Sequence, residues 1–256
     1  MASRQRIKQS INAKDSAKAA RVSAFMLRLD KFLQSNLEKI LGDIDANTGG
    51  LEAARALGGL QSAMEAAGLT KELGALSAIY GDELTQLRES FRLSTNKNLV
   101  YNTVDVETLE TLINFDIERF TTNINTYLGD VKSLVLQSVL AGSSPDIAAL
   151  HDDLGSRLVS NMETELNTAL SATAQAISLK KSEAVGITKY LYDGPSDDDV
   201  IRPFCQEHVG KIYTIDEIRA LDNGQGLPVE TYKGGYNCRH EWVPLSDELA
   251  AKIEDE

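Results

Sequence analysis

The feature that most constrains this chain is the scarcity of helix-breaking proline in its first 185 positions. Of the five prolines in the 256-residue sequence, only Pro145 lies in this region. Proline removes a backbone donor and clashes with the preceding turn, so its scarcity permits long helices. Apolar residues also recur there at the three- and four-residue spacing of an amphipathic helix rather than at the alternating spacing of a strand. The sequence therefore predicts a mainly α-helical protein.

The clearest helical pattern extends from residue 105 to residue 140, with Asp105 as its expected cap. Its apolar positions are Leu109, Leu112, Ile113, Ile117, Phe120, Ile124, Tyr127, Leu128, Val131, Leu134 and Val135. At 1.5 Å per residue, such an unbroken helix would be about 54 Å long. Further apolar helical patterns, which can supply its packing partners, occur at residues 25–41, 51–67, 76–91 and 158–177. Residues 1–185 are therefore predicted to form an elongated antiparallel helical bundle.

Local signals refine this prediction at three places. The second quarter should contain short or broken helices because it is interrupted by glycines, namely Gly49, Gly50, Gly58, Gly59, Gly68 and Gly74. Another helix is expected to begin with Ser144 as its N-cap and Pro145 at its first position. His151 is followed by two aspartates, and we expect it to be a surface side chain.

The composition changes near residue 186. Both cysteines, the only tryptophan, four of the five prolines and two of the three histidines lie in the last 71 residues. Patterns there predict strands at 187–192 and 241–244 and helices at 204–209, 215–221 and 247–253, the last capped by Ser246. The sequence thus divides into a helical assembly region, residues 1–185, and a small α+β domain, residues 186–256.

Four side chains of the second region form the one cluster with metal-binding chemistry: Cys205, His208, Cys238 and His240. Residues three apart on a helix lie on one face, and residues two apart on a strand do too, so each Cys–His pair could chelate jointly. Four thiolate and imidazole ligands form a closed structural zinc site. A structural metal ion would stabilise a small domain whose hydrophobic core is small. Packed free cysteines, a catalytic Cys–His pair and a disulfide remain as alternatives.

Other functional motifs are absent from the sequence. It contains no glycine-rich phosphate loop, no GxSxG elbow and no HExxH pair, so we expect a protein that is not an enzyme. The acidic run Asp197–Asp199 is expected to be a solvated turn. Neither a run of eighteen apolar residues nor a secretory signal is visible, which predicts folding in a cytoplasm and no membrane partner.

The net charge of −12 is unevenly distributed along the chain. Residues 1–40 carry nine basic and three acidic side chains, whereas residues 186–256 carry seven basic and fifteen acidic ones. A basic N-terminal segment could contact nucleic acid or an acidic partner. Because its charges are interleaved with apolar residues, a solvated helix face is the favoured interpretation, and DNA contact through residues 1–40 is kept as an alternative.

The second region resembles the C-terminal domain of the phage Mu F-like minor head proteins. The similar segments are Tyr192-Asp-Gly-Pro, Asp199, Arg202-Pro-Phe-Cys205, His208, Gly210-Lys-Ile-Tyr213-Thr, Ile215-Asp-Glu-Ile218, and Gly234-Gly-Tyr-Asn-Cys238-Arg-His240-Glu-Trp242-Val-Pro244. They cover about a quarter of the chain, in the order typical of the family. Many relatives end with His-Pro-x-Cys-Arg-Cys, where this chain has Gly-Gly-Tyr-Asn-Cys-Arg-His.

The resemblance implies a structural protein of the phage head that takes part in head morphogenesis. It implies a position near the portal or inside the capsid, presence in several copies or as a homo-oligomer, and portal or major capsid proteins as partners. It also implies that Arg202 and Arg239 pair with carboxylates of the acidic domain. An enzyme or toxin-like domain using Cys205 or His240 is the alternative from a different class.

Overall fold

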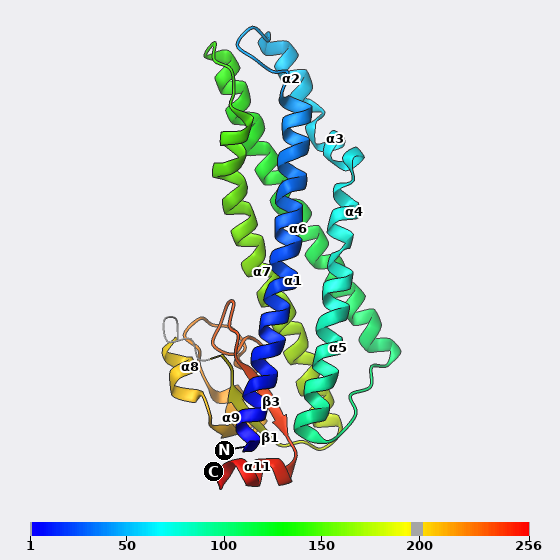
Figure 1. Cartoon of the computed structure of the whole chain (residues 1–256), viewed down its shortest axis with the longest axis vertical. Coiled ribbons are helices and arrows are strands. Elements are labelled where there is room, and N and C mark those ends of the chain that lie inside the picture. The colour runs from blue at the N-terminus through cyan, green and yellow to red at the C-terminus, as the bar shows by residue number, and fades with distance from the viewer. Residues whose placement is uncertain (1, 196–201, 256) are drawn as a thin grey trace. The chain divides into compact units, whose positions relative to one another are not determined.

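Helices dominate the computed structural model, which describes residues 2–195 and 202–255 (Figure 1). The helices of the described part are α1 (Ala2–Leu41), α2 (Gly50–Gly58), α3 (Leu60–Ala67), α4 (Leu69–Gly74), α5 (Leu76–Thr95), α6 (Thr103–Leu140), α7 (Ile147–Ala184), α8 (Pro203–His208), α9 (Ile215–Ala220), α10 (Val229–Tyr232) and α11 (Asp247–Glu254). The strands there are β1 (Lys189–Asp193), β2 (Ile212–Tyr213) and β3 (Glu241–Leu245). None of these helices combines the length and apolar character needed to cross a bilayer. The predicted order, a long helical region and then a small α+β region, is confirmed.

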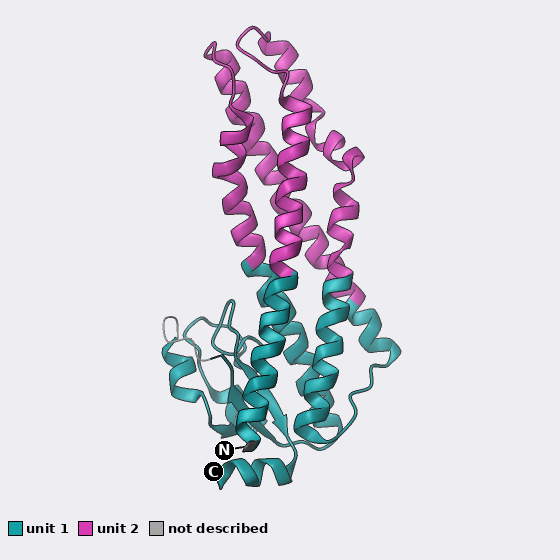
Figure 2. Cartoon of the chain, in the orientation of Figure 1, with its two compact units in different colours: residues 1–21, 78–109, 164–256 teal, residues 22–77, 110–163 magenta. Residues whose placement is uncertain are grey.

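The chain divides into two compact units (Figure 2). Unit 1 contains residues Met1–Arg21, Ala78–Leu109 and Thr164–Glu256, and unit 2 contains Val22–Ser77 and Glu110–Glu163. The long helices α1, α6 and α7 therefore contribute residues to both units.

Unit 1 is organised around a three-stranded antiparallel sheet of order β2-β1-β3. In the central strand β1, Tyr192 lies opposite Trp242 and Tyr190 lies opposite Pro244. Proline has no backbone N–H, and its position in an edge strand leaves no inner ladder bond unmade. Strands β1 and β3 lie close to the strands predicted at 187–192 and 241–244, whereas the short strand β2 was not predicted.

The two faces of the sheet have different cores because successive side chains of a strand point to opposite sides. Tyr190 and Tyr192 pack on one face with both cysteines, Trp242 and Leu179 of α7. The other face is made by Leu191, Val243 and Leu245, with Ile7 and Ile11 of α1 and Ala250 and Ile253 of α11. Helices distant in sequence thus cover both faces of the sheet.

The compact units do not divide at residue 186, where the sequence predicts a domain boundary. The composition changes there because the sheet begins, with its aromatic and cysteine-rich core. A sheet of three short strands cannot bury both of its apolar faces alone. Residues 186–256 therefore share unit 1 with parts of α1, α5, α6 and α7.

Unit 2 is entirely helical in its described secondary structure. In α1, the side chains buried at four-residue intervals are Phe25, Leu29, Leu33, Leu37 and Leu41. In α6, the buried side chains are Phe120, Ile124, Tyr127, Leu128, Val131 and Val135. The glycine-rich quarter forms the short helices α2, α3 and α4, as predicted, and Gly68 ends α3 with a φ of 110° that suits glycine.

Two helix starts differ from their predicted caps. Asn102 caps α6, because its Oδ1 accepts from the N–H of Asp105 at 2.9 Å while Oδ2 of Asp105 accepts from the N–H of Asn102. For α7, Asp146 accepts from the N–H of Ala149 at 3.0 Å, so the helix begins two residues later than Pro145. Ser144 instead accepts from the N–H of Ala46. Short polar side chains compete for a cap, and tertiary contacts decide between them. Ser246 caps α11 as predicted.

His151 is the main departure from the sequence prediction in unit 2. It is buried, with only 2% of its surface exposed. Its Nδ1 lies 2.6 Å from the Tyr127 hydroxyl, and its Nε2 lies 3.2 Å from Oδ1 of Asp30. Gly155, one turn further along α7, leaves room for the ring, since a Cβ there would lie 2.7 Å from it. The expectation of a surface side chain is wrong because the partners of His151 come from α1 and α6.

Candidate metal centre

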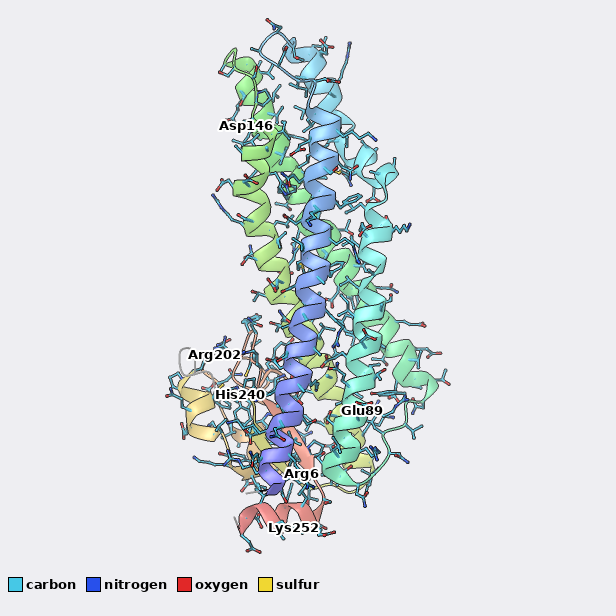
Figure 3. All side chains as sticks on the ribbon, viewed as in Figure 1. Arg6, Glu89, Asp146, Arg202, His240 and Lys252 are labelled. Atoms are coloured by element: carbon cyan, nitrogen blue, oxygen red, sulfur yellow. The ribbon has the colours of Figure 1, made fainter. Side chains whose placement is uncertain are left out.

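Cys205 is held at a fixed position by the short helix α8. Pro203 stands at the start of this helix, where its missing N–H costs no hydrogen bond, and Cys205 is buried. Arg202, just before the helix, donates to the backbone oxygens of Gly234 and Tyr236. Arg202 therefore ties α8 to the turn before Cys238, and within the described part of the chain its contacts are with these backbone oxygens rather than with the carboxylate that the resemblance implies. Arg202 and His240 lie in the same part of unit 1 (Figure 3).

Cys238 and His240 lie on the segment that leads from α10 into β3. Lys233, Gly235 and Asn237 have positive φ values, so this segment turns sharply. It is anchored to α7, because the N–H of Asn237 donates to Oγ1 of Thr168 at 2.8 Å. The backbone thus delivers both metal-binding side chains to the face of the sheet that Cys205 contacts.

Two glycines allow the close approach of these side chains. A Cβ on Gly234 would lie 2.6 Å from Sγ of Cys205 and 3.3 Å from Sγ of Cys238. A Cβ on Gly194, the residue after β1, would lie 2.8 Å from Cα and ring atoms of His240. Neither glycine has a positive φ. Glycine is needed at both positions for space rather than for backbone conformation.

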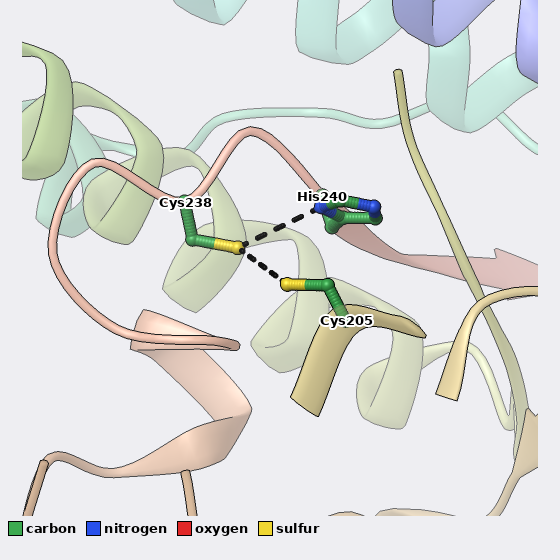
Figure 4. Close-up of side chains that lie close together, drawn as sticks. All are labelled: Cys205, Cys238 and His240. Atoms are coloured by element: carbon green, nitrogen blue, oxygen red, sulfur yellow. Dashed lines mark hydrogen bonds between the residues drawn. The ribbon is translucent and has the colours of Figure 1, made fainter. Parts of the chain in front are cut away.

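The ligand atoms of Cys205, Cys238 and His240 all lie within 4.8 Å of one another, and all three residues are buried (Figure 4). The two Sγ atoms are 3.8 Å apart, and Sγ of Cys238 is 3.9 Å from Nδ1 of His240. A tetrahedral zinc ion with Zn–S of about 2.3 Å and Zn–N of about 2.0 Å would separate two sulfurs by about 3.8 Å and a sulfur from a nitrogen by about 3.5 Å. The three residues could therefore hold a metal ion.

The charges at the centre favour a thiolate on Cys238. The Cys205 thiol donates to Sγ of Cys238, which lowers the pKa of Cys238 and raises that of Cys205. Burial opposes ionisation of Cys238, while His240 and the ammonium group of Lys233 favour it. Burial also lowers the pKa of Lys233 from its ordinary value of 10.5 to about 8. Because the thiolate is the metal-binding form, Cys238 is poised to bind a cation.

His208 is the predicted ligand that does not join the cluster. Among the described residues, only the other three predicted ligands meet within the distance that a metal site requires. Nδ1 of His208 lies 2.6 Å from the Tyr213 hydroxyl, and its ring packs against Phe204 at 4.3 Å between centroids. A three-residue spacing places two side chains near one helix face, but neighbouring side chains decide where each one points. The predicted set of four is thus reduced to Cys205, Cys238 and His240.

Other predicted features have varied outcomes. The acidic run Asp197–Asp199 lies outside the described residues. Arg239 pairs with the carboxylate of Asp15 of α1, at 3.7 Å. Tyr192 and Gly194 belong to the surroundings of the centre and were not expected there. The alternation of Tyr190 and Tyr192 could have placed Tyr192 on a buried face, but not beside the sulfurs.

Comparisons with known proteins add no relative. No family model matches the sequence, and neither a curated protein nor a solved structure is significantly similar to it. The assignment to a family therefore stays a hypothesis that rests on the residues quoted above.

Proposed function

We propose that this chain is a minor head protein of a tailed bacteriophage and that a structural zinc ion stabilises its sheet region. The observation that carries the proposal is that the two segments most similar to the Mu F-like family come together in the fold. Arg202-Pro-Phe-Cys205 and Asn237-Cys238-Arg-His240 are separated by more than thirty positions, yet they bring Cys205, Cys238 and His240 together. A metal site that serves folding rather than catalysis is expected to be buried in this way.

Zinc is the metal that this ligand chemistry favours. Thiolate sulfur and imidazole nitrogen are its usual ligands in structural sites, whereas magnesium and calcium take oxygen ligands. Bound zinc would link α8 to the segment before β3 and so stabilise one face of the sheet. The zinc ion would therefore act as a cross-link between these two segments of the chain.

Exposed apolar side chains support a role in assembly. In unit 2, Leu51 is 67% exposed and Leu140 is 71% exposed. The two belong to neighbouring parts of that unit, because a Cβ on Gly50 would lie 3.1 Å from the Leu140 side chain. Exposed apolar side chains that lie near one another can form part of a surface that another protein covers. We propose portal or major capsid proteins as the partners.

The two alternatives have weaker support. An enzyme using Cys205 or His240 would need substrate to reach a centre whose members are at least nine-tenths buried. DNA contact would need free positive charge on residues 1–40, yet several basic side chains there pair with carboxylates. These pairs are Arg4 with Asp193, Lys14 with Glu83 and Glu241, Lys18 with Asp15, Arg21 with Glu83, and Arg28 with Glu72.

The assembly role is tested in purified phage particles whose genome encodes this chain. Density-gradient particles are digested, and peptides of the chain are quantified against the major capsid protein by mass spectrometry. We expect the chain to travel with the particles in few copies per particle. A Leu51→Ser, Leu140→Ser variant should be incorporated less. Particles that lack the chain would refute the assignment to the head.

The zinc site is tested on the purified full-length chain. Native mass spectrometry should find one zinc per chain, and His240→Ala should lose it. His208→Ala is the matched control, because that histidine lies in the same region but outside the cluster, so the variant should retain zinc. Loss of zinc from both variants, or from neither, contradicts the three-ligand centre.

A further inference from the structure

A closed structural zinc site has four ligands, and the cluster described above supplies three. The remaining corner must be taken by water or by a side chain of another type. Tyr192 is a candidate for this corner because its hydroxyl oxygen can bind a metal and lies beside both sulfurs. The hydroxyl is 3.3 Å from Sγ of Cys205 and 3.6 Å from Sγ of Cys238.

These two distances match the separation between sulfur and oxygen in a tetrahedral zinc site. With Zn–O of about 2.0 Å and Zn–S of about 2.3 Å, a fourth oxygen ligand lies about 3.5 Å from each sulfur. The Tyr192 oxygen is within about 0.2 Å of that separation from both sulfurs. Water need not be invoked to fill the corner.

The Tyr192 ring is fixed in this position by its surroundings. The side chain is fully buried on the central strand β1. It stacks on His240 with an interplanar angle of 7° and a centroid distance of 5.2 Å, and it contacts Trp242 at 4.4 Å and the edge of Phe204 at 5.8 Å. A buried hydroxyl needs a polar partner, and the two sulfurs provide it. The oxygen is therefore held against both sulfurs of the centre.

The charge at the centre suits an anionic oxygen when a cation is bound. A divalent cation is the largest local charge in such a site, so it favours the anionic form of an oxygen bound to it. The buried ammonium group of Lys233, which interacts with Cys238, offsets the negative charge of three anionic ligands.

We propose that the Tyr192 hydroxyl is the fourth ligand of the metal ion held by Cys205, Cys238 and His240. This inference rests on the proposed zinc site and specifies how that site is closed. On binding, the phenol O–H bond breaks, its proton leaves to the buffer, and the oxygen's electron pair forms the bond to the metal.

The test is a titration of Zn²⁺ into the metal-free full-length chain, followed by near-ultraviolet difference absorption. Wild type should develop the signal of one tyrosinate per bound zinc. Tyr192→Phe should lose this signal and bind zinc about 10 to 100 times more weakly. Tyr190→Phe is the matched control, because Tyr190 is equally buried on the same face of β1 and its hydroxyl bonds to the oxygen of Ile187 instead. It should behave as wild type.

The outcomes separate this inference from the site it rests on. Zinc binding by wild type without a tyrosinate signal would overturn the role of Tyr192 and leave the three-ligand centre standing. No zinc binding by wild type would overturn both. The wild-type titration decides the matter even if Tyr192→Phe fails to fold, which circular dichroism would reveal.

Discussion

Replacing Gly234 with alanine should disable the metal centre without touching a ligand. The added Cβ would lie 2.6 Å from Sγ of Cys205, 3.3 Å from Sγ of Cys238 and 3.5 Å from Cδ1 of Phe204. Non-bonded heavy atoms prefer separations of about 3.5 Å or more, so the Cys205 sulfur or the turn must move by about 1 Å. Because Gly234 has no positive φ, backbone strain is not part of the effect.

The size of the effect follows from the tolerance of metal coordination. Metal–ligand distances must hold within about 0.2 Å, and a displacement of about 1 Å exceeds this severalfold. We expect zinc affinity to fall by about 100-fold or more. With free zinc at 100 times the wild-type Kd, binding stabilises the wild-type fold by about 2.7 kcal/mol. A 100-fold weaker variant would keep about 0.4 kcal/mol of that stabilisation under the same conditions.

Competition against a chromophoric chelator measures both affinities. Gly81→Ala is the matched control, because Gly81 lies in α5 of the same unit and no atom would meet its Cβ within 4 Å. It should bind zinc as wild type does and gain about 0.5 to 1 kcal/mol from better helix propensity. An affinity of Gly234→Ala within threefold of wild type would refute the steric reasoning.

Three further predictions concern other contacts of the two units. Gly194→Ala should weaken zinc binding, because the new Cβ would lie 2.8 Å from ring atoms of His240 and displace this ligand. Competition against a chelator measures the affinity, and an unchanged affinity would mean that the clash is relieved elsewhere. Asp105→Asn should destabilise the fold at pH 7 by about 1 to 3 kcal/mol, because it breaks a part-buried ion pair with Lys181 of α7. Burial opposes ionisation of Asp105, but that ion pair and a backbone N–H outweigh it and hold its pKa below the usual 3.8. The stabilising effect is therefore present above pH 3.8 and lost as the pH falls through the folded-state pKa of Asp105. The free energies of unfolding of wild type and variant, measured in urea, should therefore converge in acid. A difference that stays constant with pH would contradict this. His151→Phe should destabilise the fold by about 1 to 3 kcal/mol, since it leaves the Tyr127 hydroxyl without its partner, and an unchanged urea midpoint would count against the buried contact.

Local patterns in the sequence determined most of the secondary structure and most residues of the candidate metal centre. The long helix of residues 103–140, the broken helices near Gly58 and Gly68, and the strand at 241–245 all follow from spacing and helix-breaking residues. These features depend on interactions within a few residues of one another, which is why one sequence suffices to predict them. The predicted pairing of Cys205 with Cys238 and His240 rested on residue type and was confirmed as a cluster.

Tertiary structure decided which polar side chains meet. It turned His208 toward Tyr213, brought Tyr192 to the two sulfurs, and buried His151 between partners from α1 and α6. It also placed the first turns of α1 against the sheet, so that the C-terminal region is not a compact unit by itself. Periodicity shows which face of an element is buried, but the residue that lies against that face comes from a distant part of the chain. Side-chain direction and the packing of several elements together select that residue, and neither is encoded in local spacing.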